Sequence, residues 1–312
     1  MNLKHSNDIK AEAKRLGFFT CGIAKATRVS QEVETHLRCW LAEGMNADME
    51  WMNNYLDKRL DPRLLMDGLK SIVSIAMSYV PQKTLPSDEP QIAAYALGLD
   101  YHDVVKQKLH QLAAAIYGEE NVKTANYRVF VDSGPVLERY WAEQAGLGWV
   151  GKNRQLIIPH AGSMFFLGEL FLDFETEYDH PITNRCGKCT KCIDHCPTHA
   201  LSDSRKFDAQ LCLSYQTIEN RQELSHEAKK HMGKFIYGCD RCQQICPWNR
   251  FAEPNHTPEF QPREELLNMT VDKWKKLSVE DYRRLFKGSA VKRVKYKGLM
   301  RNISNLFSKF EP

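Results

Sequence analysis

The chain has 312 residues, of which 43% are hydrophobic and 26% charged, the ordinary balance of a globular protein. Its first residues are charged and hold no apolar signal-peptide core, and its longest uncharged stretch, residues 155–168, is too short and too polar to cross a bilayer. The sequence therefore predicts a cytoplasmic protein without a membrane partner, and it excludes a small secreted disulfide scaffold.

In chain order, apolar residues at helical spacing predict helices over residues 5–16, 30–44 and 102–117. Continuous or alternating apolar residues predict strands over residues 71–80, 127–131, 155–158 and 163–174. Ser133, Gly134 and Pro135 predict the start of a further helix, which has Asp132 or Ser133 as its N-cap, runs through Ala145 and ends at Gly146.

This mixture of helices and strands predicts an α/β or α+β domain over residues 1–178. Residues 179–255 hold most of the cysteines and predict a ferredoxin-like domain, and residues 256–312 predict a basic helical segment. Residues 270–312 alone carry 12 Lys and Arg against 4 Asp and Glu, although the net charge of the whole chain is only +4. Such a segment is either a solvated helix face or a contact surface for nucleic acid, and its charge does not decide between the two.

Eight of the ten cysteines lie within residues 186–246. The first four, in CGKCTKCIDHCP, have the spacing of the bacterial ferredoxin run, whose fourth cysteine ligates the other cluster. The second string, CDRCQQICPW, lacks its first cysteine because Ile236 stands there, and Cys212 is left to replace it. We therefore predict two 4Fe-4S clusters, the first held by Cys186, Cys189, Cys192 and Cys246 and the second by Cys196, Cys212, Cys239 and Cys242.

Structural zinc is the main alternative, because it also binds four closely spaced cysteines. Zinc requires neither the two Cys-Pro endings nor the pattern of three cysteines and then one, so the cluster interpretation fits better. Cys21 and Cys39 lie outside this window and are expected to be small core residues.

Asp132 is the candidate catalytic acid. It follows an apolar strand at the point where a helix is predicted to begin, and α/β folds place their chemistry at such positions. Burial against a large ligand would raise the pKa of Asp132 and let it donate a proton near neutral pH. From position alone, a plain N-cap aspartate is the simpler explanation.

Six blocks of sequence, taken in order, resemble the epoxyqueuosine reductases, an iron-sulfur and cobalamin-dependent family related to the reductive dehalogenases. The blocks are DKRLDPR (57–63), GLDYHD (98–103), VDSGPVLER (131–139), AGLGWVGKN (145–153), GSMFFLGE (162–169) and the cysteine strings with their CPWN ending. The resemblance continues through GSAVKRVKYKGLMRN (288–302).

The resemblance implies a reductive-dehalogenase-like cobalamin-binding domain joined to a two-cluster ferredoxin-like domain. It also implies the last step of queuosine synthesis, in which the epoxide of epoxyqueuosine at the wobble position of tRNA is reduced. The clusters would pass electrons from a low-potential donor to base-off cobalamin, cobalt would attack an epoxide carbon, and Asp132 would protonate the opening oxygen. A monomer is expected.

The resemblance further implies contacts to cobalamin and to tRNA. The family's cobalamin contacts fall on Arg59, Ala93, Asp132, Leu156, Leu167, Ser214 and Asp240, and a tRNA contact falls on Asn220. Many members continue into C-terminal helical repeats, whereas this sequence is expected to be a short form. The basic segment is therefore expected to hold tRNA phosphates through Lys292, Arg293, Lys295, Lys297 and Arg301.

Three other functions fit parts of the sequence. A plain two-cluster electron carrier would use the first 180 or so residues to dock a redox partner. A cytoplasmic reductive dehalogenase would act on a small halogenated molecule, although the basic segment argues against it. A zinc-stapled RNA-binding protein would contain zinc in place of about eight irons.

Overall fold

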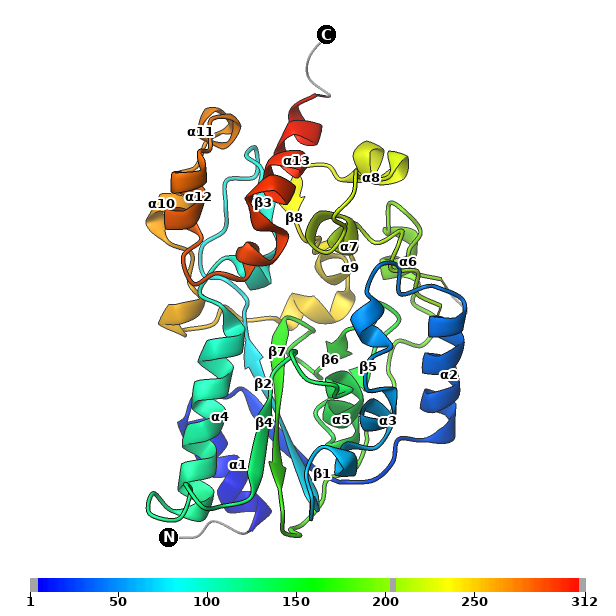
Figure 1. Cartoon of the computed structure of the whole chain (residues 1–312), viewed down its shortest axis with the longest axis vertical. Helices are drawn as coiled ribbons and strands as arrows, with labels where there is room; N and C mark the ends of the chain where they lie inside the picture. Colours follow the sequence, from blue (N-terminus) through cyan, green and yellow to red (C-terminus); the bar gives the residue numbers. More distant parts are fainter. Residues whose placement is uncertain (1–4, 203–205, 309–312) are drawn as a thin grey trace.

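The computed structural model describes residues 5–202 and 206–308, and a four-stranded sheet with the order β1-β2-β7-β4 lies at the centre of its lower half (Figure 1). Each strand is antiparallel to its neighbour, which makes this part of the chain an α+β arrangement. The strands are β1 (Thr20–Lys25), β2 (Ser71–Ser78), β4 (Tyr127–Phe130) and β7 (Phe165–Leu172).

The two faces of the sheet are covered by different helices, as the alternation of side chains along a strand requires. Val73 and Ile75 of β2 pack with α1 (Ser6–Arg15) and α4 (Tyr101–Tyr117), whereas Ile72 and Ala76 pack with α5 (Glu138–Gln144). Farther out on the α5 side lie α2 (Gln31–Ala42) and α3 (Leu56–Leu60) (Figure 1).

The predicted helices and strands of this part are confirmed, except at the start of α5. The sequence missed β1, and β6 (Leu156–Ile157), which pairs with β5 (Trp149–Val150), is shorter than expected. The N-cap prediction for Asp132 or Ser133 is wrong, because the helix begins only at Glu138 and Leu137 is its N-cap. Asp132 has a φ of +53°, in the left-handed region, so the chain turns there instead of entering a helix.

The cysteine-rich and C-terminal segments form the upper half of Figure 1 from short elements. These are α6 (Lys191–Asp194), α7 (Leu213–Ile218), α8 (His226–His231), α9 (Arg241–Gln244), α10 (Glu264–Leu267), α11 (Val271–Lys275), α12 (Val279–Leu285) and α13 (Lys295–Phe307). β8 (Phe235–Tyr237) pairs in parallel with β3 (Gln91–Ile92). Short 3-10 helices occupy Glu50–Met52, Pro62–Leu64, Ala94–Ala96, Pro247–Phe251, Pro258–Phe260 and Ala290–Val294.

One hydrophobic core joins all three of the expected segments. It contains Ile92 from the first, Ile236 from the cysteine-rich segment, and Trp274 and Leu299 from the C-terminal segment. Asn302 of α13 is fully buried and donates hydrogen bonds to the carbonyl groups of Thr217 and Ile236. Packing therefore crosses both expected limits, at residues 178 and 255, and the limits themselves stay predictions. The outer ends of the first and last segments, residues 1–4 and 309–312, lie outside the described part of the chain.

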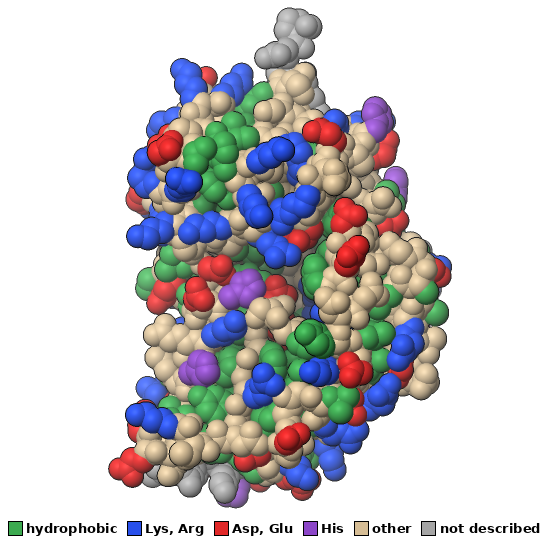
Figure 2. Space-filling model, viewed as in Figure 1, with side chains coloured by type: hydrophobic (Ala, Val, Ile, Leu, Met, Phe, Trp, Pro, Cys, Tyr) green, Lys and Arg blue, Asp and Glu red, His purple; other side chains and the backbone are tan. Residues whose placement is uncertain are grey.

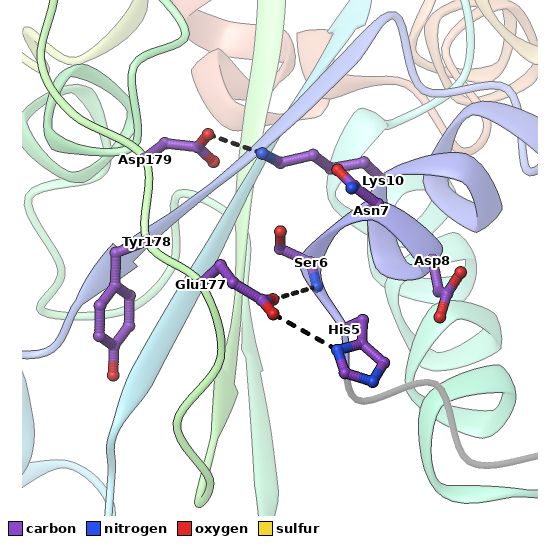
Figure 3. A pocket seen from close by; sticks show the side chains of 8 residues that line it. All are labelled: His5, Ser6, Asn7, Asp8, Lys10, Glu177, Tyr178 and Asp179. Atoms are coloured by element: carbon purple, nitrogen blue, oxygen red, sulfur yellow. Dashed lines mark hydrogen bonds and ion pairs between the residues drawn. The ribbon is translucent and has the colours of Figure 1, made fainter.

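The connection after β7 is fastened to α1 and β1 (Figure 3). Glu177 accepts a hydrogen bond of 2.9 Å from the N–H of Ser6, and Asp179 binds Lys10 at 2.6 Å and the N–H of Ile23 at 2.8 Å. A hollow of about 620 Å³ opens among these residues. No cysteine and no predicted site residue lines it, so we assign this region an anchoring role.

The expectation for the two cysteines outside the cluster window holds for one of them. Cys21 packs partly buried against the core, as expected, but Cys39 is exposed on α2, so that expectation is wrong for Cys39. In the described residues, no helix has both the length and the apolar character needed to span a bilayer.

Candidate active site and cluster sites

Four cysteines surround a cavity of about 350 Å³, and they are the four predicted for the first cluster: Cys186, Cys189, Cys192 and Cys246. Trp149 donates a hydrogen bond of 3.4 Å from Nε1 to Sγ of Cys186. Arg185 and Arg250 also line the cavity, beside apolar walls that include Trp248. Four thiols around one cavity are the donor set of a 4Fe-4S cluster, and Cys246 joins the first three as the crossover rule predicts.

The other four cysteines are also electrostatic neighbours of one another. Cys212 lies beside Cys196, and Cys242 lies beside both Cys212 and Cys239. Burial raises the pKa of Cys239 to about 12 and that of Cys242 well above its usual value. Such thiols ionise only next to strong positive charge, which the iron of a cluster supplies. Cys192 of the first set is an electrostatic neighbour of Cys242, so the two sites adjoin.

Asp132 is the centre of a polar cluster at the edge of the sheet. Tyr101, the first residue of α4, donates a hydrogen bond of 2.5 Å to Oδ2 of Asp132. Nε2 of His102 lies 3.5 Å from the same oxygen, and its Nδ1 lies 2.7 Å from Oδ1 of Asp100. The N–H of Asp132 donates to Glu138. The side chain of Asp132 remains 62% exposed, so the cluster is open on one side.

The polar residues around Asp132 hold one proton, which lies on the imidazole of His102. Burial lowers the pKa of His102, but hydrogen bonds to Asp100 and Asp132 outweigh this and raise it to about 9. Burial alone would raise the pKa of Asp132, whereas hydrogen bonds from His102 and Tyr101 hold it below its usual value. At neutral pH an imidazolium therefore faces a carboxylate, and the pair together carries one transferable proton.

Tyr101 and His102 were missed as functional residues by the sequence analysis. Both lie in the GLDYHD block, but on the sequence alone nothing connects them with Asp132, 31 residues away from Tyr101. Their presence in a block shared with the family was the one available signal.

Some predicted cobalamin contacts lie beside Asp132 and others beside the second cluster. Arg59 is buried, its Nε has no hydrogen-bond partner in the described part of the chain, and Asp132 is its charged neighbour. Asp240 is buried on the cluster side and accepts a hydrogen bond of 2.7 Å from the N–H of Ala94. Tyr79 has electrostatic neighbours in both regions, Asp240 and Cys242 in one and Arg139 in the other.

The other predicted cobalamin contacts are apolar or small. Leu156 and Leu167 pack in the core on the α5 side of the sheet. Ala93 lies against Gly238, where a side chain would come within 2.5 Å of its Cβ. Ser214 lies in the first turn of α7, two residues after Cys212.

The predicted tRNA contacts divide into exposed and structural residues. Asn220 is only 6% exposed, and its amide binds Gln216 and the carbonyl of Glu223. Arg301 donates to the carbonyl groups of Gln216, Asn220 and Gln222, so its guanidinium is occupied in joining α13 to α7. These two side chains stabilise the surface instead of presenting free groups.

The other four basic residues are exposed: Lys292, Arg293, Lys295 and Lys297. Arg293 forms a two-pronged ion pair with Glu219, at 2.8 and 2.7 Å, and is an electrostatic neighbour of Asp132. Figure 2 shows Lys and Arg side chains gathered on the upper half around α13, above a hollow that crosses this face. These four residues form the basic surface, which therefore borders the polar residues around Asp132.

Fold and site together define an iron-sulfur oxidoreductase with a two-cluster module. Residues 185–249 match the family model of a 4Fe-4S double cluster binding domain, and residues 59–133 match that of "Epoxyqueuosine reductase QueG, DUF1730". The epoxyqueuosine reductase of Cellulophaga algicola is 45% identical over 303 residues, which cover 97% of this chain and 98% of the relative. The chain belongs to the epoxyqueuosine reductase family.

Solved structures agree with this assignment. An epoxyqueuosine reductase bound to an epoxyqueuosine-modified tRNA-Tyr stem loop superposes with a TM-score of 0.85 at 29% identity, covering 97% of this chain and 81% of that one. The Bacillus subtilis epoxyqueuosine reductase, in a structure whose catalytic aspartate loop is swung out of the active site, gives 0.83 at 29% identity, with the same coverage. The predicted resemblance and the two-cluster module are confirmed, and the zinc alternative is set aside.

Proposed function

We propose that this chain reduces the epoxide of epoxyqueuosine at the wobble position of tRNA, giving queuosine, the last step of its synthesis. The observation that carries the proposal is the position of Asp132. It lies in an open group of polar residues. Arg139 is an electrostatic neighbour of both Asp132 and Tyr79, and Tyr79 is in turn an electrostatic neighbour of Cys242 in the second set of cysteines. Conversion of an epoxide to an alkene and water consumes two electrons and two protons, so a proton donor near a cluster is what the reaction needs.

Asp132 is proposed as the residue that delivers the proton to the opening oxygen. His102 stores the proton, but its side chain is 30% exposed against 62% for Asp132. Asp132 therefore has the better access to a substrate, so it would take the proton from the imidazolium of His102 and pass it to the opening oxygen. The aspartate on the catalytic loop of the Bacillus subtilis relative supports this assignment.

Base-off cobalamin is proposed as the group that receives the electrons, and the residues present fit it. The unpartnered Nε of buried Arg59 is available to a polar side group of the corrin, and Ala93 and Leu167 offer apolar contact. Leu156 would support that wall, while Ser214 and Asp240 would hold the side nearest the second cluster. When bound, cobalamin supplies a reducible and strongly nucleophilic cobalt.

The tRNA is proposed to lie across the basic surface, with its modified base reaching into the hollow. Lys292, Lys295 and Lys297 would contact phosphates, because they are exposed and no ion pair to a described acid engages them. Arg293 would steer the backbone while it stays paired to Glu219. Asn220 and Arg301 would stabilise the backbone beneath this surface through their hydrogen bonds to carbonyl groups.

Electrons are proposed to enter at the first cluster from a low-potential donor. Its cavity reaches the surface and has Arg185 and Arg250 at its rim, which suits a carrier with an acidic face. The monomeric state and the cytoplasmic location stay predictions.

An anaerobic assay tests the function. Protein loaded with iron, sulfide and cobalamin is incubated with a low-potential reductant and tRNA that carries epoxyqueuosine, and the nucleosides are separated after digestion. Queuosine is the expected product. Protein that retains both clusters and cobalamin but leaves the epoxide intact, or that reduces halogenated small molecules instead, would refute the proposal.

A further inference from the structure

Two glutamates that the proposed reaction leaves unused meet behind the turn at Asp132. Glu138 is the first residue of α5, and Glu169 lies fully buried in β7. Their carboxyl groups are close electrostatic neighbours. Glu138 also accepts the hydrogen bond from the backbone N–H of Asp132. Among the described residues, neither buried carboxyl oxygen of Glu169 has a hydrogen-bond partner.

The sheet explains why Glu169 is so deeply placed. It stands opposite Ser74 on β2 and Phe130 on β4, in the interior of the sheet. Side chains alternate along β7, and Phe171 packs on the α5 side, so Glu169 points to the same side. An unpaired carboxylate there would cost several kcal/mol, and no Lys or Arg of the described residues forms a hydrogen bond with it.

Two carboxyl groups this close together at such a place cannot both be ionised near neutral pH. The charged or titratable neighbours of the pair are Asp132, Arg139 and Tyr101, and Arg139 is the one cation among them. Burial and the charge of Asp132 raise the pKa of Glu138 to about 8. Burial and the neighbouring Glu138 raise the pKa of Glu169 well above its usual value.

We propose that Glu138 and Glu169 are positioning residues, a proton-sharing carboxyl pair that holds the turn at Asp132 so that its side chain faces Tyr101 and His102. The turn needs such a support, because Asp132 has a positive φ and a non-glycine residue is strained there. Ser133 adds a short-range bond, from its N–H to the carbonyl of Val131 at 2.5 Å, and its Oγ accepts a hydrogen bond of 3.1 Å from Nζ of Lys106. The inference rests on the proposed function only for its catalytic consequence.

Amide hydrogen exchange of the full chain with its cofactors tests the support directly. In Glu138→Ala, the peptide over residues 131–137 should exchange about tenfold faster or more, since a hydrogen bond to a carboxyl group is lost. Glu138→Gln should stay near wild type, because the amide oxygen still accepts from the N–H of Asp132. The matched control is Glu143→Ala, which removes the bond of 2.8 Å from the N–H of Val150 to the same helix. Unchanged exchange in Glu138→Ala would overturn the proposal.

Infrared spectroscopy tests the shared proton without any substrate. At pH 7 the wild type should show a band of protonated carboxyl groups that Glu169→Gln lacks, so the band should appear in the difference spectrum of the two proteins. Buried Asp240 also contributes to this region but is present in both proteins, so it cancels. An identical band in both proteins would contradict proton sharing. If both tests succeed and the wild type still leaves epoxyqueuosine unchanged, the proposed function fails while the support for the turn stands.

If the wild type does reduce epoxyqueuosine, single-turnover rates decide the catalytic consequence. Glu138→Ala should then slow the reaction about tenfold or more, while Glu138→Gln and Glu143→Ala should not. A loosened turn together with a wild-type rate would show that these glutamates stabilise the loop but do not position Asp132 for the reaction.

Discussion

The hydroxyl of Tyr101 lies 2.5 Å from Oδ2 of Asp132, and two stacked rings hold it there. The ring of Tyr101 is stacked on Phe166 of β7, with centroids 4.4 Å apart and planes 4° apart, and on His102 at 4.1 Å. The start of α4 is thereby packed onto the central sheet beside the turn that carries Asp132. Ring stacking thus fixes the hydrogen-bond donors of the site, and little reorganisation remains for the reaction step.

Replacing Tyr101 by Phe should keep the stack but remove the hydrogen bond to Asp132. The pKa of Asp132 should rise, because that bond lowers it, but the carboxyl group also loses the contact that orients it, so the rate of epoxide reduction should fall about tenfold. The measurement is a single-turnover rate with saturating tRNA. Tyr95→Phe is a suitable control, since its hydroxyl contacts Tyr237 at 3.2 Å and not Asp132. Equal rates for Tyr101→Phe and wild type would show that this bond is dispensable.

The reaction should slow in alkaline solution. The His102 imidazole, with a pKa of about 9, is protonated below that pH and neutral above it, so the stored proton disappears as pH rises through about 9. Asp100→Asn removes a carboxylate that raises this pKa, and it should move the decline to lower pH. The pH profile of the single-turnover rate checks both points. A decline that stays in place in the Asp100 variant would assign it to another group.

Replacing Cys212 by Ala should remove one cluster and leave the other. The wild type should hold about eight irons per chain and the variant about four, with the spectrum of the remaining first cluster unchanged. Cys39→Ala, on the exposed face of α2, is the control and should keep all the iron. A full iron content in Cys212→Ala would mean that another residue completes the second cluster.

Charge reversal on the basic surface should weaken tRNA binding. Lys292→Glu, Lys295→Glu and Lys297→Glu should each reduce the slope of log affinity against log salt by about one. Lys14→Glu, on α1 at the opposite end of Figure 1, should change neither affinity nor slope. Binding is measured by fluorescence titration at several salt concentrations. If all three lysine variants bind like wild type, the tRNA lies elsewhere.

Local patterns in the sequence predicted most helices and strands and the two-cluster module, because spacing along the chain determines both, while the assignment of each cysteine to one cluster stays a prediction. Asp132 was recognised as a site residue but for a partly wrong reason, since it starts a turn and not a helix. Arg301 looked like a phosphate contact because charge is visible in sequence, whereas the three carbonyl groups that occupy it are not. The pairing of Glu138 with Glu169 depends on the register of β7 and could not be predicted from spacing.

The most direct test of the account is the rate of epoxide reduction in Asp132→Asn. The variant keeps the shape of the side chain but cannot carry the proton, so a single-turnover assay with epoxyqueuosine-containing tRNA should show a loss of about 100-fold or more. Iron content, the corrin absorption band and tRNA affinity should match the wild type. Conversion by Asp132→Asn at the wild-type rate would contradict the assignment of Asp132 as the proton donor.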